Sequence, residues 1–81
     1  DPDTQDPAGR TALHFASAAG HADTVHALLA HGADTTVQDV NGNTPLHLAV
    51  VSNHLDAVLV LLRANANPAA TDARHRTPVQ L

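Results

Sequence analysis

The sequence predicts an all-α repeat fold, a solenoid of stacked helix–turn–helix units, and three observations lead to this prediction. Asp6, Asp39 and Asp72 stand thirty-three residues apart, and the residues that follow them recur at the same interval. Apolar residues recur within each copy at the three- and four-residue spacing of an amphipathic helix. Glycine or asparagine follows each of these helical patterns. A period of this length is typical of units that each contact only their neighbours.

Two complete copies of the repeat are present, over residues 6–38 and 39–71. Their identical positions fall on the turns, the predicted helix starts and the apolar faces. These twelve pairs are Asp6/Asp39, Gly9/Gly42, Thr11/Thr44, Leu13/Leu46, His14/His47, Ala16/Ala49, His21/His54, Asp23/Asp56, Val25/Val58, Leu28/Leu61, Leu29/Leu62 and Ala33/Ala66.

The first helix of each copy begins after a threonine. Thr44 can cap a helix through its hydroxyl, and Pro45 suits the first helical position because its missing N–H costs nothing there. Ala12 replaces this proline in the first copy, which makes that helix start less rigid. Leu46 and Ala49 follow at helical spacing, and we expect both to point inward.

The second helix of each copy carries an apolar stripe. In the second copy we expect Leu55, Val58, Leu61 and Leu62 to form it, and in the first copy Val25, Leu28 and Leu29.

The turns are marked by residues that tolerate a positive φ. Gly20 and Gly32 follow the two helices of the first copy, and Asn53 and Asn65 replace them in the second. Asparagine is the next most tolerant residue of this conformation, so the substitutions support real turns. His75 stands where the other copies have Gly9 and Gly42, so we expect a strained or frayed turn there.

These motifs resemble the ankyrin repeat. The resemblance rests on T-P-L-H-L-A at 44–49, T-A-L-H-F-A at 11–16, G-H at 20–21 and L-L-A-H-G-A-D at 28–34, and it covers essentially the whole chain. It implies an ankyrin solenoid in which β-turn fingers precede the helix pairs. Residues 1–5 then form the tail of a preceding repeat, 6–38 and 39–71 are complete repeats, and 72–81 begin a further one.

Composition limits how such a fold can be stabilised. The 81 residues contain no cysteine and one aromatic residue, Phe15, so Leu, Val and Ala must build a small core. Repeat arrays usually need about three units and polar end caps. We therefore expect the ends to lose a neighbour's cover and end-to-end self-association to be possible. The residues concerned are Leu13, Phe15, Val25, Leu61 and Leu62.

Charge and motif content argue against several classes of function. The formal net charge is −4 and Tyr and Trp are absent, which disfavours nucleic-acid binding. No apolar run is long enough to span a membrane, so we expect no membrane partner and a cytoplasmic or nuclear location. No phosphate-binding glycine motif occurs and the two serines lack an evident base, so we expect no cofactor and no catalysis.

The histidines also fit structural roles. The resemblance implies that His14 and His47 hydrogen-bond the capping residues Thr11 and Thr44 and a neighbouring repeat, and that His21 and His54 tie the helix–helix turns. We expect His26 and His31 to face solvent. Equivalent histidines one repeat apart are separated by roughly 10 Å of helix packing, too far to share a zinc ion, so we expect no metal site.

The resemblance places partner-facing positions on the fingers and at the ends of the first helices. The candidate residues are Gln5, Pro7, Ala8, Arg10, Ala18, Ala19, Gln38, Val40, Asn41, Asn43, Val51, Ser52, Thr71, Arg74 and Arg76. Val40 and Val51 are the most informative, although isolated surface valines are common. Arg10, Arg74 and Arg76 would favour an acidic segment or peptide of a partner.

The predicted function is therefore a non-enzymatic protein–protein interaction module that binds another protein on its concave face of fingers and first helices. The alternative is a structural spacer or a regulatory segment of a larger intracellular protein, for example a ligase adaptor or a kinase-associated repeat array.

Overall fold

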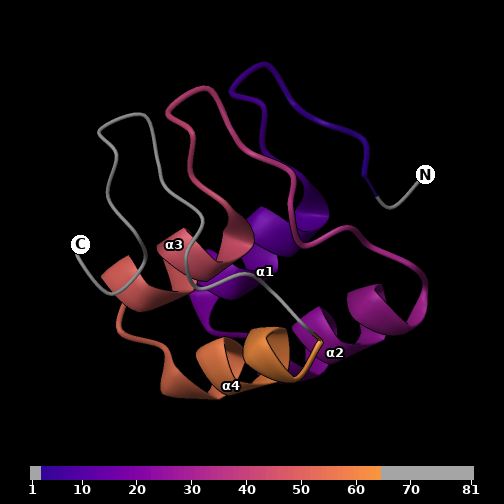
Figure 1. The fold of residues 1–81 in the computed structure, drawn as a ribbon, viewed down its shortest axis with the longest axis vertical. Helices are drawn as coiled ribbons and strands as arrows, with labels where there is room; N and C mark the ends of the chain where they lie inside the picture. Colours follow the sequence, from indigo (N-terminus) through magenta and orange to yellow (C-terminus); the bar gives the residue numbers. More distant parts are fainter. Residues whose placement is uncertain (1–2, 65–81) are drawn as a thin grey trace.

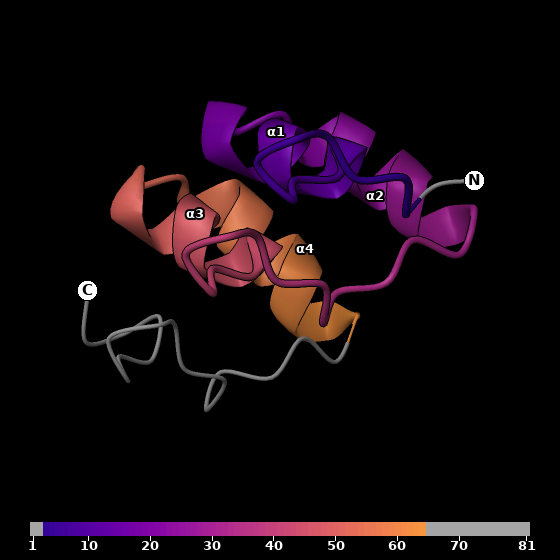
Figure 2. The ribbon, with the colours of Figure 1, turned by 90° about the horizontal axis from the view of Figure 1, so that it is seen from above.

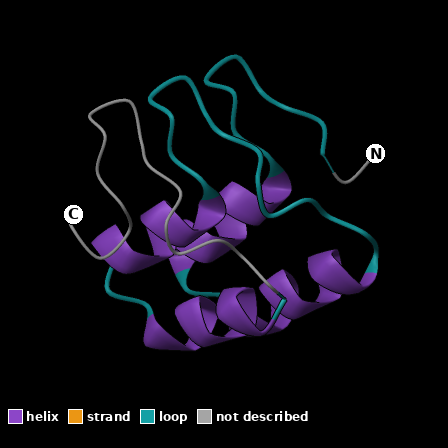
Figure 3. Cartoon of the chain, viewed as in Figure 1, coloured by secondary structure: helices purple, strands orange, loops and turns teal. Residues whose placement is uncertain are grey.

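The structure is a computed structural model that describes residues 3–64. Its helices are α1 (Ala12–Ala19), α2 (Ala22–Ala30), α3 (Pro45–Val51) and α4 (Leu55–Arg63) (Figures 1 and 3). No strand occurs between residues 3 and 64. The predicted all-α repeat fold is confirmed.

The helices form two layers that run through both repeats. α1 packs against α3 in one layer and α2 against α4 in the other, while each repeat also packs its own two helices together. Figure 2 shows the pair α3–α4 stacked on the pair α1–α2. The loops that precede α1 and α3 extend side by side from the α1–α3 layer, away from α2 and α4 (Figure 1).

The start of each first helix is fixed by its cap. The Oγ1 atoms of Thr11 and Thr44 accept hydrogen bonds from the backbone N–H of His14 and His47, which completes one half of a capping box. Pro45 occupies the first turn of α3, where no partner for its nitrogen is needed. The caps inferred from the sequence are confirmed.

The ends of the helices match the predicted turns. Gly20, which ends α1, has a φ of 75°, Gly32 after α2 has 88°, and Asn53 after α3 has 59°. Asparagine therefore does replace glycine at a left-handed position of the second repeat. Asn65 and His75 lie outside the described residues.

The core lies between the two layers and is shared by both repeats. Its buried members are Leu13, Ala16, Val25, Ala33, Leu46, Ala49, Ala57 and Leu61. Leu46 and Ala49 point inward as predicted. The expectation that Leu13, Val25 and Leu61 would lose cover is wrong, because all three are fully buried, whereas Phe15 and Leu62 are exposed as expected. All three belong to the core cluster.

The predicted stripe on α4 is wrong in part. Leu61 is buried and Val58 packs against the core, but Leu55 and Leu62 are exposed and Ala57 is buried instead. Helical spacing alone is compatible with more than one rotation of this helix, because α4 is apolar around most of its circumference. Packing against α2 and α3 buries the face that carries Ala57 and Leu61.

The two glycines that follow the helices of the first repeat, Gly20 and Gly32, allow a matched test of why glycine is needed. A Cβ on Gly20 would lie 2.5 Å from the His54 ring of the second repeat, whereas a Cβ on Gly32 would meet nothing within 4 Å. Gly32→Ala should lower the free energy of unfolding by about 1 kcal/mol through its positive φ alone. Gly20→Ala should lower it by about 2 kcal/mol or more, because the His54 ring must also move. Urea unfolding measures both, and equal losses would contradict the close packing of His54 on Gly20.

Candidate functional site

We call the surface formed by the two fingers, residues 6–10 and 39–43, and the exposed sides of α1 and α3 the finger face. Each finger is a tight turn organised by its leading aspartate. Asp6 Oδ1 accepts hydrogen bonds of 2.9 Å from the backbone N–H groups of Ala8 and Arg10. Asp39 Oδ1 accepts the same pair from Asn41 and Asn43. The recurrence of the aspartate is therefore explained by the turn that it holds.

The two fingers are also joined to each other. The backbone N–H of Val40 donates to the carbonyl oxygen of Ala8 at 2.9 Å. Gln5 Nε2 donates to the Gly9 carbonyl within its own finger at 2.8 Å, and more weakly to the Gln38 carbonyl at 3.4 Å. These bonds fix the position of the second finger relative to the first.

Gln5 and Gln38, both proposed partner-facing residues, brace the fingers. Gln38 Nε2 donates to the Gly42 carbonyl at 3.0 Å, in the same way that Gln5 braces Gly9. Both side chains remain exposed. A partner that bonded these amide groups would compete with the bonds that hold the fingers.

Arg10 and Asp39 form an ion pair between the repeats. Arg10 Nε lies 3.2 Å from Asp39 Oδ2, and the Asp39 side chain is fully buried. Asp39 thus accepts from Asn41, Asn43 and Arg10 together, which compensates the burial of its charge. Arg10, which we expected to favour an acidic partner, thus uses its Nε–H for a carboxylate of the same chain, while its side chain stays partly exposed.

His14 connects the first helix cap to the second repeat. Its Nδ1 lies 3.1 Å from the Thr11 backbone nitrogen and 2.9 Å from Thr11 Oγ1. Its Nε2 lies 2.8 Å from the Asn43 carbonyl oxygen. A carbonyl only accepts and a backbone N–H only donates, so Nε2 carries the proton and Nδ1 does not. This geometry therefore requires the neutral imidazole in one tautomer.

The environment of His14 favours this neutral form. Burial lowers the pKa of His14 below its ordinary value of 6.5, and the hydrogen bond to Asn43 and the charge of Asp39 only partly oppose the effect. In the second repeat, Nδ1 of His47 contacts Thr44 in the same way, at 3.2 Å from its nitrogen and 2.8 Å from its hydroxyl. Both imidazoles are fully buried.

His21 and His54 do not act as the sequence led us to expect. They precede α2 and α4 as N-cap residues, but neither side chain makes a capping hydrogen bond. The His54 ring instead packs against Gly20 of the preceding repeat. Sequence reasoning missed this contact, because the only sign of it was glycine at position 20. His26 and His31 are exposed.

The remaining candidate residues differ in exposure. Val40 and Val51 are 69% and 62% exposed. Pro7, Ala19 and Asn41 are exposed, while Ala8, Ala18, Asn43 and Ser52 are half-buried. Thr71, Arg74 and Arg76 lie outside the described residues.

Groups suited to chemistry are few in the described part of the chain. No cluster of His, Cys, Asp or Glu that could hold a metal ion occurs in residues 3–64. Ser17 Oγ is buried without a hydrogen-bond partner there, a feature that the sequence did not indicate. Its complete burial keeps this hydroxyl from any substrate. None of the described helices is both long enough and apolar enough to cross a membrane.

A comparison with known protein families matched most of the chain. The family described as ankyrin repeats (3 copies) matches residues 1–72. A search of curated proteins found no match to the chain.

The buried ion pair predicts unequal effects of its two partners on stability. Asp39→Ala removes the acceptor of three hydrogen bonds and should lower the free energy of unfolding by about 2–4 kcal/mol. Arg10→Ala should lower it by less than about 1 kcal/mol, because Arg10 is partly exposed and the backbone donors to Asp39 remain. Urea unfolding of the two variants tests this order, and a larger loss for Arg10→Ala would contradict it.

The depressed pKa of His14 predicts that acid destabilises the fold. The unfolded chain binds a proton at this imidazole near pH 6.5, whereas the folded chain does so only at lower pH. The stability that neutral His14 contributes is therefore present above pH 6.5 and is lost as the pH falls towards the folded-state pKa. Proton NMR should show His14 titrating below 6.5. Titration at or above 6.5 would refute the assigned cause.

Proposed function

Because the chain belongs to the ankyrin repeat family, we propose that it is a non-enzymatic module that binds another protein through its finger face. Ankyrin repeats generally mediate protein–protein interaction. The proposal assigns this general role to one surface of this chain and to particular residues on it.

The observation that carries the proposal is the exposure of Val40 and Val51. Val40 lies in the second finger and Val51 is the last residue of α3, and neither is needed to fill the core. Leaving two valines in water forgoes the stabilisation that burial would bring. A partner that covers them would recover it.

The shape and rigidity of the finger face suit an extended peptide or a helix. Ala18 and Ala19 are small residues at the end of α1, the first half-buried and the second exposed, so they leave room for the side chains of a partner. The bond from Val40 to Ala8, the Arg10–Asp39 ion pair and the bond from His14 to Asn43 hold the two fingers in place. A surface fixed before binding loses less conformational entropy when the partner arrives.

The alternative is that the repeats act as a spacer or regulatory segment, which would need no partner on the finger face. A double substitution distinguishes the two functions. Val40→Asp with Val51→Asp should abolish capture of a partner, because the charges would be buried against it. Affinity capture followed by titration calorimetry with the captured protein measures the loss.

A matched control lies in the other layer. Leu55→Asp with Leu59→Asp changes two exposed apolar residues of α4 in the same way and should leave partner binding intact. Circular dichroism and urea unfolding should show that both double variants remain folded. Equal binding by wild type and the Val40/Val51 variant would refute the finger face as the docking surface and favour the spacer.

A further inference from the structure

The second finger contains an asparagine that is followed by a glycine. Asn41–Gly42 is the only such pair in the sequence, and the matching positions of the other copies are Ala8–Gly9 and Arg74–His75. Asparagine is thermolabile, because the backbone nitrogen of the residue that follows it can attack its side-chain carbonyl carbon. Glycine hinders this attack least, since it has no Cβ. This pair is therefore the point of the chain at which an asparagine is most open to reaction with its own backbone.

The other described asparagines are less favourably placed for such a reaction. Asn43 is half-buried and precedes Thr44, a buried β-branched residue that caps α3. Asn53 is exposed but precedes His54, whose ring packs against the preceding repeat. A side chain therefore shields the nitrogen that follows each of them. Asn41 is exposed, and the residue after it carries no side chain.

Hydrogen bonds of the finger restrain the reacting nitrogen. The Gly42 N–H donates to the Asp39 carbonyl oxygen at 2.9 Å, and the Gly42 carbonyl oxygen accepts from Gln38 Nε2 at 3.0 Å. The Asn41 N–H donates to Asp39 Oδ1 at 2.9 Å. Attack requires the Gly42 nitrogen to lose its proton and to turn towards the Asn41 side chain, so the first of these bonds must open. Surface turns open at a small cost in free energy, so the finger slows the reaction without preventing it.

We propose that Asn41 is a site of spontaneous deamidation, at which the chain modifies its own second finger. The Gly42 nitrogen forms a bond to Cγ of Asn41 and gives its proton to water, while the side-chain nitrogen takes up a proton from water and leaves as ammonia. The product is a cyclic imide. Water then opens its bond to Cγ, which gives an aspartate, or its bond to the backbone carbonyl carbon. The second route gives an isoaspartate, in which the backbone runs through the former side chain.

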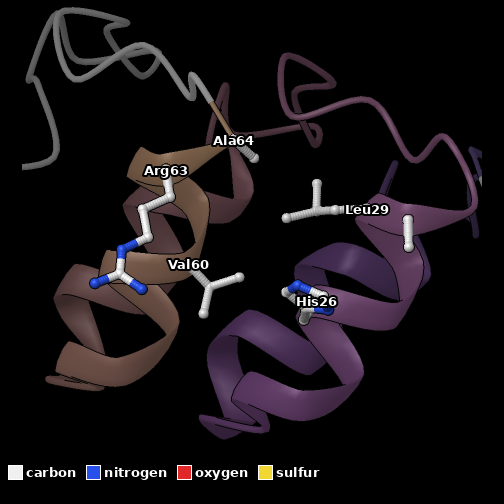
Figure 4. A pocket seen from close by; sticks show the side chains of 6 residues that line it. His26, Leu29, Val60, Arg63 and Ala64 are labelled. Atoms are coloured by element: carbon white, nitrogen blue, oxygen red, sulfur yellow. The ribbon is translucent and has the colours of Figure 1, made fainter.

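The histidine and the arginine of the α2–α4 layer take no part in this reaction. His26 and Arg63 line a groove of about 360 Å³ between α2 and α4, on either side of Val60 (Figure 4). The fingers extend from the other layer, away from this groove (Figure 1). In the second finger, the carboxylate of Asp39 is paired with Arg10 and is therefore a poor base. The rate is set by how often the finger opens rather than by a neighbouring base.

The isoaspartate disturbs the boundary between the repeats. It lengthens the backbone between Asn41 and Gly42 by one atom, inside the turn that directs the N–H groups of Asn41 and Asn43 at Asp39 Oδ1. The Asn43 carbonyl oxygen, which accepts from His14 Nε2 at 2.8 Å, follows this turn directly. We expect the equilibrium constant for unfolding to rise about tenfold, as for the loss of one hydrogen bond. The reaction does not depend on the proposed function.

Prolonged incubation of the 81-residue chain at physiological temperature tests the proposal, with peptide mapping by mass spectrometry as the readout. The mass increase of deamidation should appear first at Asn41, and enzymatic methylation should detect isoaspartate there. Asn41→Ser should stay folded and lack this product. In urea the wild-type chain should react about tenfold faster, because the Gly42 N–H is then no longer held by the finger. A native chain that does not react at Asn41, or that reacts earlier at Asn53, would overturn the proposal.

A matched pair of variants tests the control by the finger. Gln38→Ala removes the bond to the Gly42 carbonyl and should raise the native rate about threefold. Thr36→Ala removes an exposed hydrogen bond to Asp34 in the loop before the finger and should leave the rate unchanged. Equal rates for Gln38→Ala and wild type would contradict control by the hydrogen bonds of the finger.

Discussion

The rest of the structure depends on one buried imidazole, that of His14, which makes hydrogen bonds in its own repeat and to the next one. His14 accepts from the Thr11 backbone through Nδ1 and donates to the Asn43 carbonyl through Nε2. The first contact fixes the start of α1, and the second places the finger that leads into α3. A solenoid has few contacts between residues distant in sequence, so a bond that spans the boundary of two repeats sets their relative position. The neutral form of one side chain therefore maintains both the local cap and the stack.

Much of the fold could be predicted from the sequence because the same capping and turn positions recur in both copies of the repeat. Thr44 followed by Pro45 predicted where α3 begins, and Asn53 in place of glycine predicted a left-handed turn. The rotation of α4 could not be predicted, since apolar residues cover most of that helix and only its packing against α2 and α3 distinguishes Ala57 from Leu55. For the same reason the covered state of Leu13 and Leu61 was missed, because burial between layers is a tertiary property.

The candidate site was less predictable than the fold. The exposure of Val40 and Val51 could be predicted, because both occupy positions of the repeat that do not contribute to the core. The ion pair of Arg10 with Asp39 could not be predicted from the sequence, because the two residues are twenty-nine positions apart and meet only when the fingers stack. His54 illustrates the same limit: its ring packs on a glycine of the previous repeat, and no local pattern around His54 announces it. The fingers thus form a surface held in place by hydrogen bonds and an ion pair, while α4 carries exposed leucines.

The boundary contacts make the two repeats a single cooperative unit. Native-state hydrogen exchange in low concentrations of urea tests it most directly, because it reports the free energy at which each helix opens. If the boundary contacts hold the repeats together, the backbone amides of α1 and α3 should exchange with one free energy of opening and the same dependence on urea. If α1 opens at a much lower free energy while α3 stays protected, the repeats are independent and the account is wrong.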